Sequence, residues 1–317
     1  MPYPGEAASL VHMDVFLTGA TGLIGSAILR RLRQDGRRVA ALARSSASAE
    51  EIDSLGAIPV PGDLEEPETW IHSALSCKGI IHAAGGPAPA ERHFAAVMRQ
   101  TCLQAEAPPR LVYTGGIWLF PPSGDVVLSE STAFEPLPAF SHLAEIIRSL
   151  QNVQRMGVAV IHPALVCGPD AGPLAEMAAA ACSGEPFRTK ATEDTLWPLV
   201  DADDLAELYL LALDSTQFRL SLFGAGIGSA RVGEIASLVG EACGAPVTLE
   251  PLNGTADDPR LDWQAGYGRS QTVSPARAVK MLGWAPKRTS LESLVGIAAG
   301  PLPSPLAKRE TPGQTTA

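Results

Sequence analysis

Three glycines at intervals of three residues stand between an apolar run and a helical pattern near the start of the chain. The run at 14–18 predicts a strand, and the pattern at 22–34 predicts a helix. Between them the first glycine permits a tight turn, the second lets the backbone approach a pyrophosphate, and the third allows close helix–strand packing. The helix N-terminus adds N–H donors and a positive dipole end. The motif therefore predicts a dinucleotide-binding turn, with a purely structural turn as the alternative. The residues expected to contact the cofactor are Gly19, Thr21, Gly22, Leu23, Ile24 and Gly25.

Apolar runs continue to alternate with helical patterns through the first half of the chain. This alternation predicts an α/β protein with a doubly wound parallel sheet, which is the Rossmann architecture. Ser48-Ala49-Glu50-Glu51 has the form of a capping box and predicts that a helix begins there. The expected strands lie at 38–43, 58–61, 79–83, 110–114 and 158–166, and the expected helices at 48–56, 67–77, 91–106 and 138–156.

The regular alternation weakens beyond residue 168. Short strands are expected at 220–223 and 247–252, and helices at 232–243 and 275–282. We therefore expect a dinucleotide-binding Rossmann domain at 13–168. A smaller C-terminal α/β substrate-binding lobe is expected at 169–300, with part of it crossing back to the Rossmann sheet. Residues 1–12 and 301–317 are expected to be flexible termini.

Charge and composition restrict the class of partner. The 317 residues carry a formal net charge of −10, which disfavours nucleic acid because phosphate binding needs a basic face. No stretch reaches the roughly 18–20 apolar residues that a membrane span needs, and no signal-peptide pattern is visible. The five cysteines form no Cys-x-x-Cys pair, which favours reduced thiols in the cytoplasm. We expect a small-molecule substrate, no nucleic-acid or membrane partner, and no metal, while a homodimer remains open.

The end of the second predicted strand bears on the choice of cofactor. An acid about twenty residues after the glycine turn would bind a ribose 2′-hydroxyl. This chain instead reads Leu42-Ala43-Arg44-Ser45-Ser46, without a carboxylate. Arg44 can pair with a 2′-phosphate and Ser45 can add a hydrogen bond. The segment therefore predicts NADP(H) in preference to NAD(H), and a solvated loop arginine is the alternative.

Further motifs follow the glycine turn in a consistent order. Together with the turn they resemble the extended short-chain dehydrogenase/reductase family, also described as NAD-dependent epimerase/dehydratase-like proteins. The resemblance covers about 13–300. It is carried by 18–25, Gly62-Asp63-Leu64, His82-Ala83-Ala84-Gly85, 162–169, 199–206 and 282–287.

The resemblance implies roles for several residues along the cofactor. Asp63 would accept a hydrogen bond from the adenine amine and Leu64 would pack on the ring. A helix N-terminal carboxylate is the alternative for Asp63. Thr114 would meet the nicotinamide, and Pro163 would lie against its carboxamide. The residues expected to line the cofactor after the fourth strand are Ala83, Ala84 and Gly85.

The family's usual catalytic relay is missing. It resembles a set of Asn, Ser, Tyr and Lys, in which a lysine one helical turn after the tyrosine lowers the tyrosine pKa. The expected serine position falls on Gly116, and the only nearby aromatic residue aligns the pair with Phe140 and Ala144. Aligning on Glu145 instead gives Leu137 and Ser141. The four tyrosines are Tyr3, Tyr113, Tyr209 and Tyr267, and four residues after them stand Ala7, Ile117, Leu213 and Gln271. The chain therefore resembles atypical members of the family.

Three side chains are candidates for replacement chemistry. His142 lies on the helix that usually carries the tyrosine, and a histidine titrates near neutrality. His162, near the end of the sixth strand, is a candidate for contacting the substrate. Thr114 could hydrogen-bond a substrate carbonyl. For all three, packing alone is the alternative.

Two further groups of residues bear on the site. Asp201, Asp203 and Asp204 precede a helical pattern, so Asp203 is expected to be an N-cap rather than a metal ligand. Trp118 and Phe120 follow the fifth strand and could wall an apolar substrate pocket, with core packing as the alternative.

These observations favour an NADP(H)-dependent oxidoreductase of the atypical type. Its substrate would be a small, uncharged organic carbonyl or alcohol, because the predicted pocket walls are apolar. Two alternatives stay open. One is a non-redox isomerase, dehydratase or cyclase on the same scaffold, and the other is a non-catalytic NADP(H)-binding protein.

Overall fold

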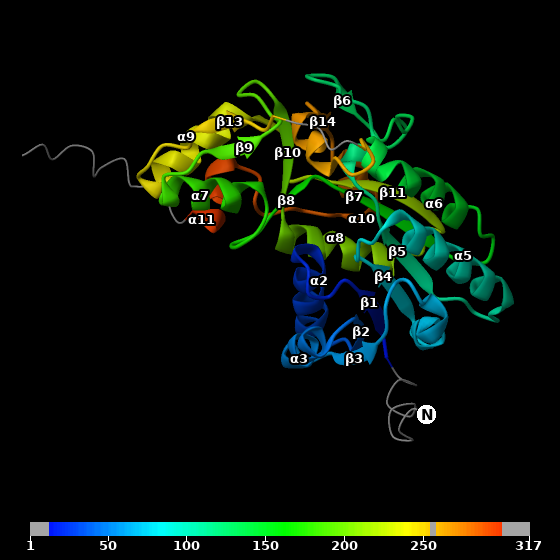
Figure 1. The fold of residues 1–317 in the computed structure, drawn as a ribbon. Coiled ribbons are helices and arrows are strands. Elements are labelled where there is room, and N and C mark those ends of the chain that lie inside the picture. Colours follow the sequence, from blue (N-terminus) through cyan, green and yellow to red (C-terminus); the bar gives the residue numbers. More distant parts are fainter. Residues whose placement is uncertain (1–12, 254–257, 300–317) are drawn as a thin grey trace, which may run out of the picture.

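A seven-stranded parallel sheet forms the centre of the computed structural model, which describes residues 13–253 and 258–299 (Figure 1). Its strands lie in the order β11-β7-β5-β4-β1-β2-β3, and all neighbours run parallel. The strands are β1 Val15–Thr18, β2 Val39–Ala43, β3 Ile58–Pro61, β4 Gly79–His82, β5 Arg110–Thr114, β7 Val158–Pro163 and β11 Arg219–Gly224. This order confirms the α/β, doubly wound Rossmann fold expected from the sequence.

Helices cover both faces of the central sheet. α2 and α8 pack together on one face, and α5 and α6 pack together on the other (Figure 1). Because both faces are covered, β1, β4 and β7 are buried along their whole length. The helices of this part are α2 Leu23–Gln34, α3 Ser46–Ser54, α4 Ile71–Leu75, α5 Ala88–Gln104, α6 Ser141–Gln151 and α8 Ala202–Asp214.

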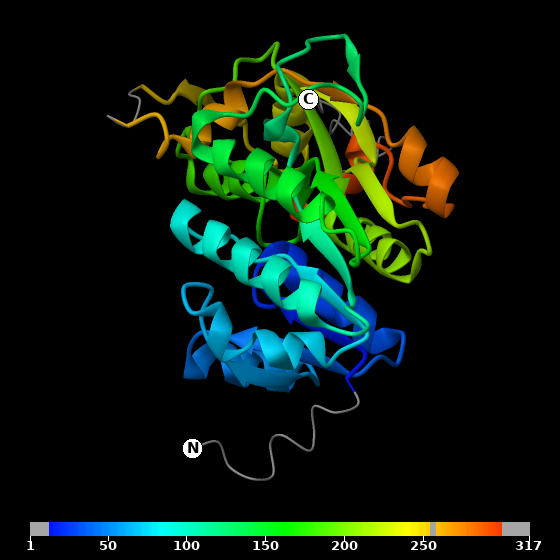
Figure 2. The same cartoon turned by 90° about the vertical axis from the view of Figure 1, so that its right-hand side faces the viewer.

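The C-terminal half builds most of a second part, which lies at the opposite end of the molecule from β1–β3 (Figure 2). It contains a three-stranded sheet β12-β10-β8 and the two-stranded sheets β13-β9 and β14-β6, with α7, α9 and α11 packed together. The strands are β6 Val127–Leu128, β8 Leu165–Cys167, β9 Phe187–Thr189, β10 Leu196–Asp201, β12 Ile227–Arg231, β13 Leu249–Pro251 and β14 Thr272–Val273. The α-helices are α7 Pro173–Ser183, α9 Val232–Cys243, α10 Ala276–Leu282 and α11 Leu291–Ala298, and the short 3₁₀ helices are η1 Pro67–Thr69, η2 Ile117–Leu119, η3 Pro138–Phe140 and η4 Trp263–Gly268.

Among the described residues, β11 and the segment at 284–288 tie the C-terminal half to the central sheet and to α8, which covers it. β11 returns to pair with β7 at the edge of that sheet. The Trp284 indole donates to the backbone oxygen of Asp204 on α8, and the Asp204 carboxylate accepts the N–H groups of Lys287 and Arg288 at 2.9 and 2.8 Å. The division into domains at 13–168 and 169–300 stays a prediction, and both expected flexible termini lie outside the described residues.

The strand expected at 158–166 is in fact two strands in different sheets. β7 ends at Pro163, whose ring removes the backbone donor that would continue the ladder. The N–H of Ala164 donates to the carbonyl of Gly224 at 2.9 Å, and β8 then pairs with β10 instead. The sequence made these two consecutive strands, separated by Ala164 alone, look like one because both are apolar.

Several expected helix boundaries are also wrong. α3 begins after Ser45, which forms a capping box with Ser48, so the box expected at 48–51 is not the cap. Ser45 has the extended backbone that an N-cap needs, and it precedes the expected cap by three residues. The helix expected at 138–156 is η3 followed by α6, which ends at Gln151. The one expected at 67–77 is η1 followed by α4, and the one expected from 91 begins at Ala88.

The N-cap of α8 is Asp201 rather than the expected Asp203. The Asp201 carboxylate accepts the N–H groups of Asp203 and Asp204, both at 3.0 Å. β10 runs directly into α8, so the last residue of the strand is the cap. Within the described residues, no helix has the length and apolar character that a bilayer span requires.

Candidate functional site

Two cavities flank the glycine-rich turn between β1 and α2. The first has a volume of about 320 Å³ and opens at the carboxyl ends of β1, β2 and β4. The second, about 240 Å³, opens at the carboxyl ends of β5 and β7. Ligands of open parallel sheets bind at this edge, where the strand order reverses. Residues of the first cavity are Gly19, Ala20, Thr21, Gly22, Leu42, Arg44, Ser48, Gly62, Asp63, Leu64, Glu65, Ala83, Ala84, Gly85, Gly86, Pro87 and Ala90.

Each glycine of the turn is favoured over a residue with a side chain for a different steric reason. Gly19 has a φ of +76°, and a Cβ there would lie 2.5 Å from the backbone nitrogen of Ala84. A Cβ at Gly25 would overlap the carbonyl oxygen of Gly19. At Gly22 the nearest protein atom to a Cβ is 3.6 Å away, so the space beside it is open to the cavity. A side chain at Gly22 would fill the place where a pyrophosphate approaches the N-terminus of α2, and the turn fits a dinucleotide.

Some of the residues expected at the turn stand behind it. The Leu23 side chain packs against Gly168, where a Cβ would clash with it, and Leu23 lines neither cavity. Gly25 supports the turn from the helix side. Ile24 lines the second cavity. The turn therefore contacts both cavities through different residues.

At the adenosine end, Arg44, Asp63 and Leu64 line the first cavity as expected, but Ser45 does not. Ser45 caps α3, and its hydroxyl accepts the N–H of Ser48 at 3.2 Å. Ser48 lines the cavity instead of Ser45 and stands four residues after Arg44. That spacing was visible in the sequence, but the misassigned capping box hid it. Asp63 also accepts the N–H of Glu65 at 2.9 Å.

The second cavity is almost entirely apolar. Thr114 and Pro163 line it, as the resemblance implied, and so does Trp118. Phe140 and Leu143 reach it from η3 and α6, the segment to which the resemblance assigned the missing tyrosine and lysine. Among the described residues, Thr114 and Trp118 are the only lining residues whose side chains carry polar atoms, and none of the lining side chains is ionisable. Its residues are Ile24, Thr114, Gly115, Gly116, Ile117, Trp118, Leu119, Phe140, Leu143, Pro163, Ala164, Leu165 and Val166.

The Thr114 hydroxyl is held by two hydrogen bonds. It donates to the carbonyl of His82 at 2.7 Å, and it therefore accepts from the Tyr209 hydroxyl, also at 2.7 Å. Tyr209 is fully buried, and this burial raises its pKa. Both hydroxyl protons are therefore used within the protein, so Thr114 can accept a hydrogen bond from a ligand hydroxyl but does not donate one to a substrate carbonyl, as the sequence had suggested, and neither hydroxyl is a base.

His162 does not reach the second cavity. Its Nδ1 accepts the N–H of Gly116 at 3.3 Å, so its Nε2 carries the proton and faces the Ser221 hydroxyl at 3.2 Å. The ring packs edge-on against Phe120 and Phe223. Complete burial lowers the pKa of His162 to about 4. The histidine is a neutral core side chain that supports the glycine turn after β5.

His142 is also absent from both cavities. It is buried on α6, which packs against α5. Burial lowers its pKa, while the carboxylates of Glu91 and Glu145 oppose that shift. Of the two expected aromatic walls, Trp118 lines the second cavity and Phe120 is fully buried in the core.

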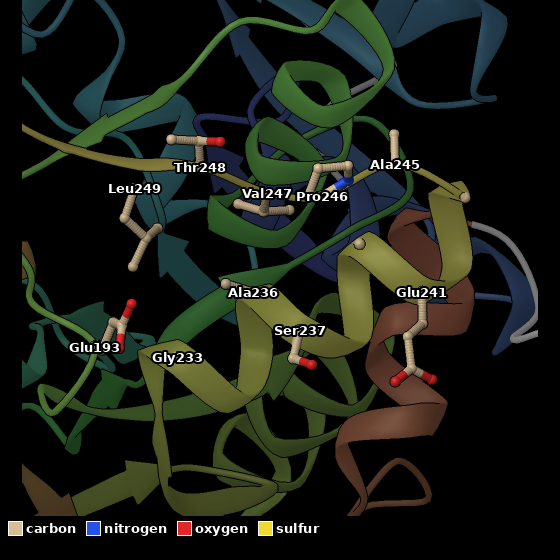
Figure 3. A pocket seen from close by; sticks show the side chains of 12 residues that line it. Glu193, Gly233, Ala236, Ser237, Glu241, Ala245, Pro246, Val247, Thr248 and Leu249 are labelled. Carbon is tan, nitrogen blue, oxygen red and sulfur yellow. The ribbon is translucent and has the colours of Figure 1, made fainter.

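Another hollow lies on the C-terminal part, between α9 and the segment at 245–249 (Figure 3). It is a shallow groove of about 750 Å³, and its charged side chains are Glu193 and Glu241. Acidic side chains repel phosphates, so this groove does not suit a dinucleotide. Within the described residues, no three His, Cys, Asp or Glu side chains are arranged to hold a metal ion.

Comparison with known proteins decides the family. The model of the NAD dependent epimerase/dehydratase family matches residues 15–220, which span the central sheet and both cavities. The chain belongs to this family. The resemblance stated from the sequence motifs is thus confirmed, and with it the binding of an NAD(P) cofactor.

Individual known proteins are similar to this chain over stretches of different length. A 4-hydroxy-2-methyl-3-oxo-4-farnesyl-3,4-dihydroquinoline-1-oxide ketoreductase from Stigmatella aurantiaca is 39% identical over 72 residues, which cover 23% of this chain and 22% of that protein. An epimerase family protein SDR39U1 homologue from Arabidopsis thaliana is 26% identical over 261 residues, covering 75% and 73% of the two chains. The crystal structure of human SDR39U1 with NADPH has a TM-score of 0.67 at 20% identity, covering 90% of this chain and 99% of that chain. The chain spans 24% or less of the length of the first curated relatives that it matches.

Proposed function

We propose that this protein is an NADP(H)-dependent oxidoreductase that acts on a small, uncharged and apolar carbonyl compound or the corresponding alcohol. The observation that carries the proposal is the second cavity. It lies across the glycine turn from the first cavity, beside Thr114 and Pro163, and no ionisable side chain of the described residues lines it. An apolar cavity favours an uncharged substrate, because a charged group would lose its hydration without gaining a partner.

The residues of this cavity would position the reactants rather than exchange protons with them. Bound NADPH supplies a hydride. Thr114, fixed by His82 and Tyr209, presents its hydroxyl oxygen at the strand end where the reacting carbon would lie. Ile24 and Phe140 exclude water from that region. Since no lining side chain titrates near neutrality, the proton that follows the hydride would come from water.

The preference for NADP(H) rests on the adenosine end of the first cavity. Arg44 lines it from the end of β2, and no ion pair engages Arg44 within the described residues. Ser48 adds a hydroxyl beside it. A guanidinium can hold a 2′-phosphate with charge-assisted hydrogen bonds. The presence of NADPH in the human SDR39U1 structure is consistent with this choice.

Titration of the purified protein with NADPH and NADH tests the cofactor proposal. The wild type should bind NADPH more tightly, and Arg44→Ala should lose about 1.5–3 kcal/mol of NADPH binding, roughly tenfold or more in affinity. Affinity for NADH should change little. Arg99→Ala, an exposed arginine on α5 outside both cavities, is the control. Equal wild-type affinities for the two cofactors would reject the preference.

A protein that binds NADP(H) without net redox turnover is the second candidate. The absence of an acid–base side chain from the second cavity favours it. The similarity to a ketoreductase from Stigmatella aurantiaca favours the first candidate. Consumption of NADPH with a panel of uncharged ketones separates them, because only the oxidoreductase consumes cofactor.

A further inference from the structure

Three neighbouring strands carry polar side chains at one level of the central sheet. Thr18 on β1 is in register with His82 on β4, and His82 is in register with Tyr113 on β5. The exposed fractions of these residues are 0%, 1% and 1%. The Thr18 hydroxyl and His82 Nδ1 lie 2.9 Å apart, and the rings of His82 and Tyr113 stack with centroids 5.1 Å apart. A buried polar row of this kind is costly unless each group is hydrogen-bonded.

Glu91 on α5 completes this row. Its Oε2 lies 3.3 Å from His82 Nε2 and accepts the Tyr113 hydroxyl proton at 3.1 Å. Its Oε1 accepts the backbone N–H of Gly86 at 3.0 Å. The carboxylate is 3% exposed. Glu91 therefore links two strands of the sheet to a backbone atom of the cofactor cleft.

The electrostatics keep this carboxylate ionised. Burial by itself raises the pKa of Glu91, but its electrostatic interaction and hydrogen bond with the His82 ring, together with its hydrogen bonds to Tyr113 and Gly86, lower that pKa overall. The bond to Gly86 is therefore charge-assisted and stronger than a neutral one.

The segment that Gly86 belongs to has little else to fix its shape. Residues 83–87 line the first cavity and contain two alanines, two glycines and one proline, so no long side chain anchors them. A Cβ at Gly85 would meet no protein atom within 4 Å. Among the described residues, the side-chain hydrogen bonds to this segment are that of Gly86 with Glu91 and a longer one, 3.4 Å, from the Ala84 N–H to Thr18, while the Ala83 N–H donates to the backbone oxygen of Thr18 at 3.2 Å. Glu91 is thus the stronger of two side-chain anchors for a wall of the cofactor cleft.

We infer that Glu91 is a positioning residue for the dinucleotide, which holds the segment at 83–87 in its binding conformation through the N–H of Gly86. The inference rests on the proposed NADP(H) binding. It assigns a binding role to a buried carboxylate that touches no substrate and takes no part in hydride transfer. His82 and Tyr113 hold the carboxylate in place through their hydrogen bonds to its Oε2.

The test compares Glu91→Leu with Met98→Ala. The first removes the acceptor for Gly86, whereas the second opens a cavity on the same buried face of α5, about two turns after Glu91. Both should lower the melting temperature. Only Glu91→Leu should weaken the binding of NADPH and of 2′,5′-ADP. Each affinity should fall by about tenfold, the loss expected for one hydrogen bond to a charged group. The smaller nucleotide reports on the first cavity alone, without the nicotinamide end.

Each outcome decides the inference. If Glu91→Leu and Met98→Ala bind both nucleotides with equal affinity, Glu91 is only structural and the inference fails. If the wild type binds neither nucleotide, the proposed cofactor fails first, and the role of Glu91 with it. If Glu91→Leu does not fold, Glu91→Gln decides, because it retains an oxygen for Gly86 but loses the charge. Weaker binding than the wild type supports the inference, and wild-type affinity overturns it.

Discussion

Two glycines of the same turn should respond differently to substitution. Gly22→Val should leave the fold largely intact, because a Cβ there meets only the Gly19 oxygen at 3.6 Å, but should abolish NADPH binding by filling the cavity. Gly25→Ala should instead lower the melting temperature, because its Cβ overlaps the Gly19 carbonyl. Circular dichroism melts and NADPH titration measure both effects. NADPH binding to Gly22→Val with wild-type affinity would show that the turn is only structural.

The buried His162 should make stability depend on pH. Its pKa is about 4 in the folded protein against 6.5 for an ordinary histidine. The unfolded chain therefore takes up a proton below pH 6.5 while the folded chain does not, so stability is lost as the pH falls from 6.5 to 4. The loss amounts to about 3 kcal/mol, at roughly 1.4 kcal/mol per pH unit. Urea unfolding at a series of pH values measures it.

The control for this pH dependence is His162→Phe. It should be less stable at neutral pH, because it leaves Gly116 N–H and the Ser221 hydroxyl without their partner. Its stability should fall less steeply than that of the wild type between pH 6.5 and 4. Parallel curves for the two proteins would assign the acid sensitivity to other groups.

Single residues could be predicted from the sequence where a motif fixes both backbone and ligand. Gly22, Arg44 and Asp63 line the cavity because the turn and the strand ends place them there. His142 and His162 could not be placed, because a histidine near a strand end or on a helix is equally suited to a cleft and to a core. Only their burial distinguishes the two.

At the scale of the elements, α8 depends on its cap. Asp201→Ala should lower the free energy of unfolding by about 1–2 kcal/mol, since it removes the acceptor for two N–H groups. It also removes the partner of Arg288. Asp203→Ala, an exposed side chain with one surface ion pair to Arg30, should change it by less than about 0.5 kcal/mol. Urea unfolding of both variants measures the difference, and a larger loss for Asp203→Ala would contradict the assignment of the cap.

The elements could be predicted best where an apolar run is bounded by turns. β1 to β5 were expected within one or two residues, because buried parallel strands alternate with amphipathic helices. β6, β9 and β14 have only two or three residues, too few for any periodicity, and their positions depend on distant partners. The break after Pro163 likewise depends on pairing with β10, which the local sequence does not encode.

Across the whole molecule, the proposed cofactor site joins parts of the chain that are far apart in sequence. Arg44 stands at the end of β2, and Pro163 at the end of β7, with the glycine turn between them. A dinucleotide held across this edge would place its phosphate-bearing ribose beside Arg44 and its nicotinamide beside Thr114. The family and fold were accessible from the sequence because they rest on ordered motifs. The apolar second cavity required the structure, since Phe140 and Leu143 reach it from η3 and α6.

The most direct test of the proposed function follows a hydride. The protein is incubated with NADPH deuterated at the nicotinamide C4 position and a panel of uncharged, apolar ketones, and the products are analysed by mass spectrometry. We expect the alcohol to carry deuterium at the former carbonyl carbon, with one NADPH consumed per product. Conversion of a substrate without label and without consumption of NADPH would contradict the oxidoreductase and leave a non-redox enzyme on the same scaffold.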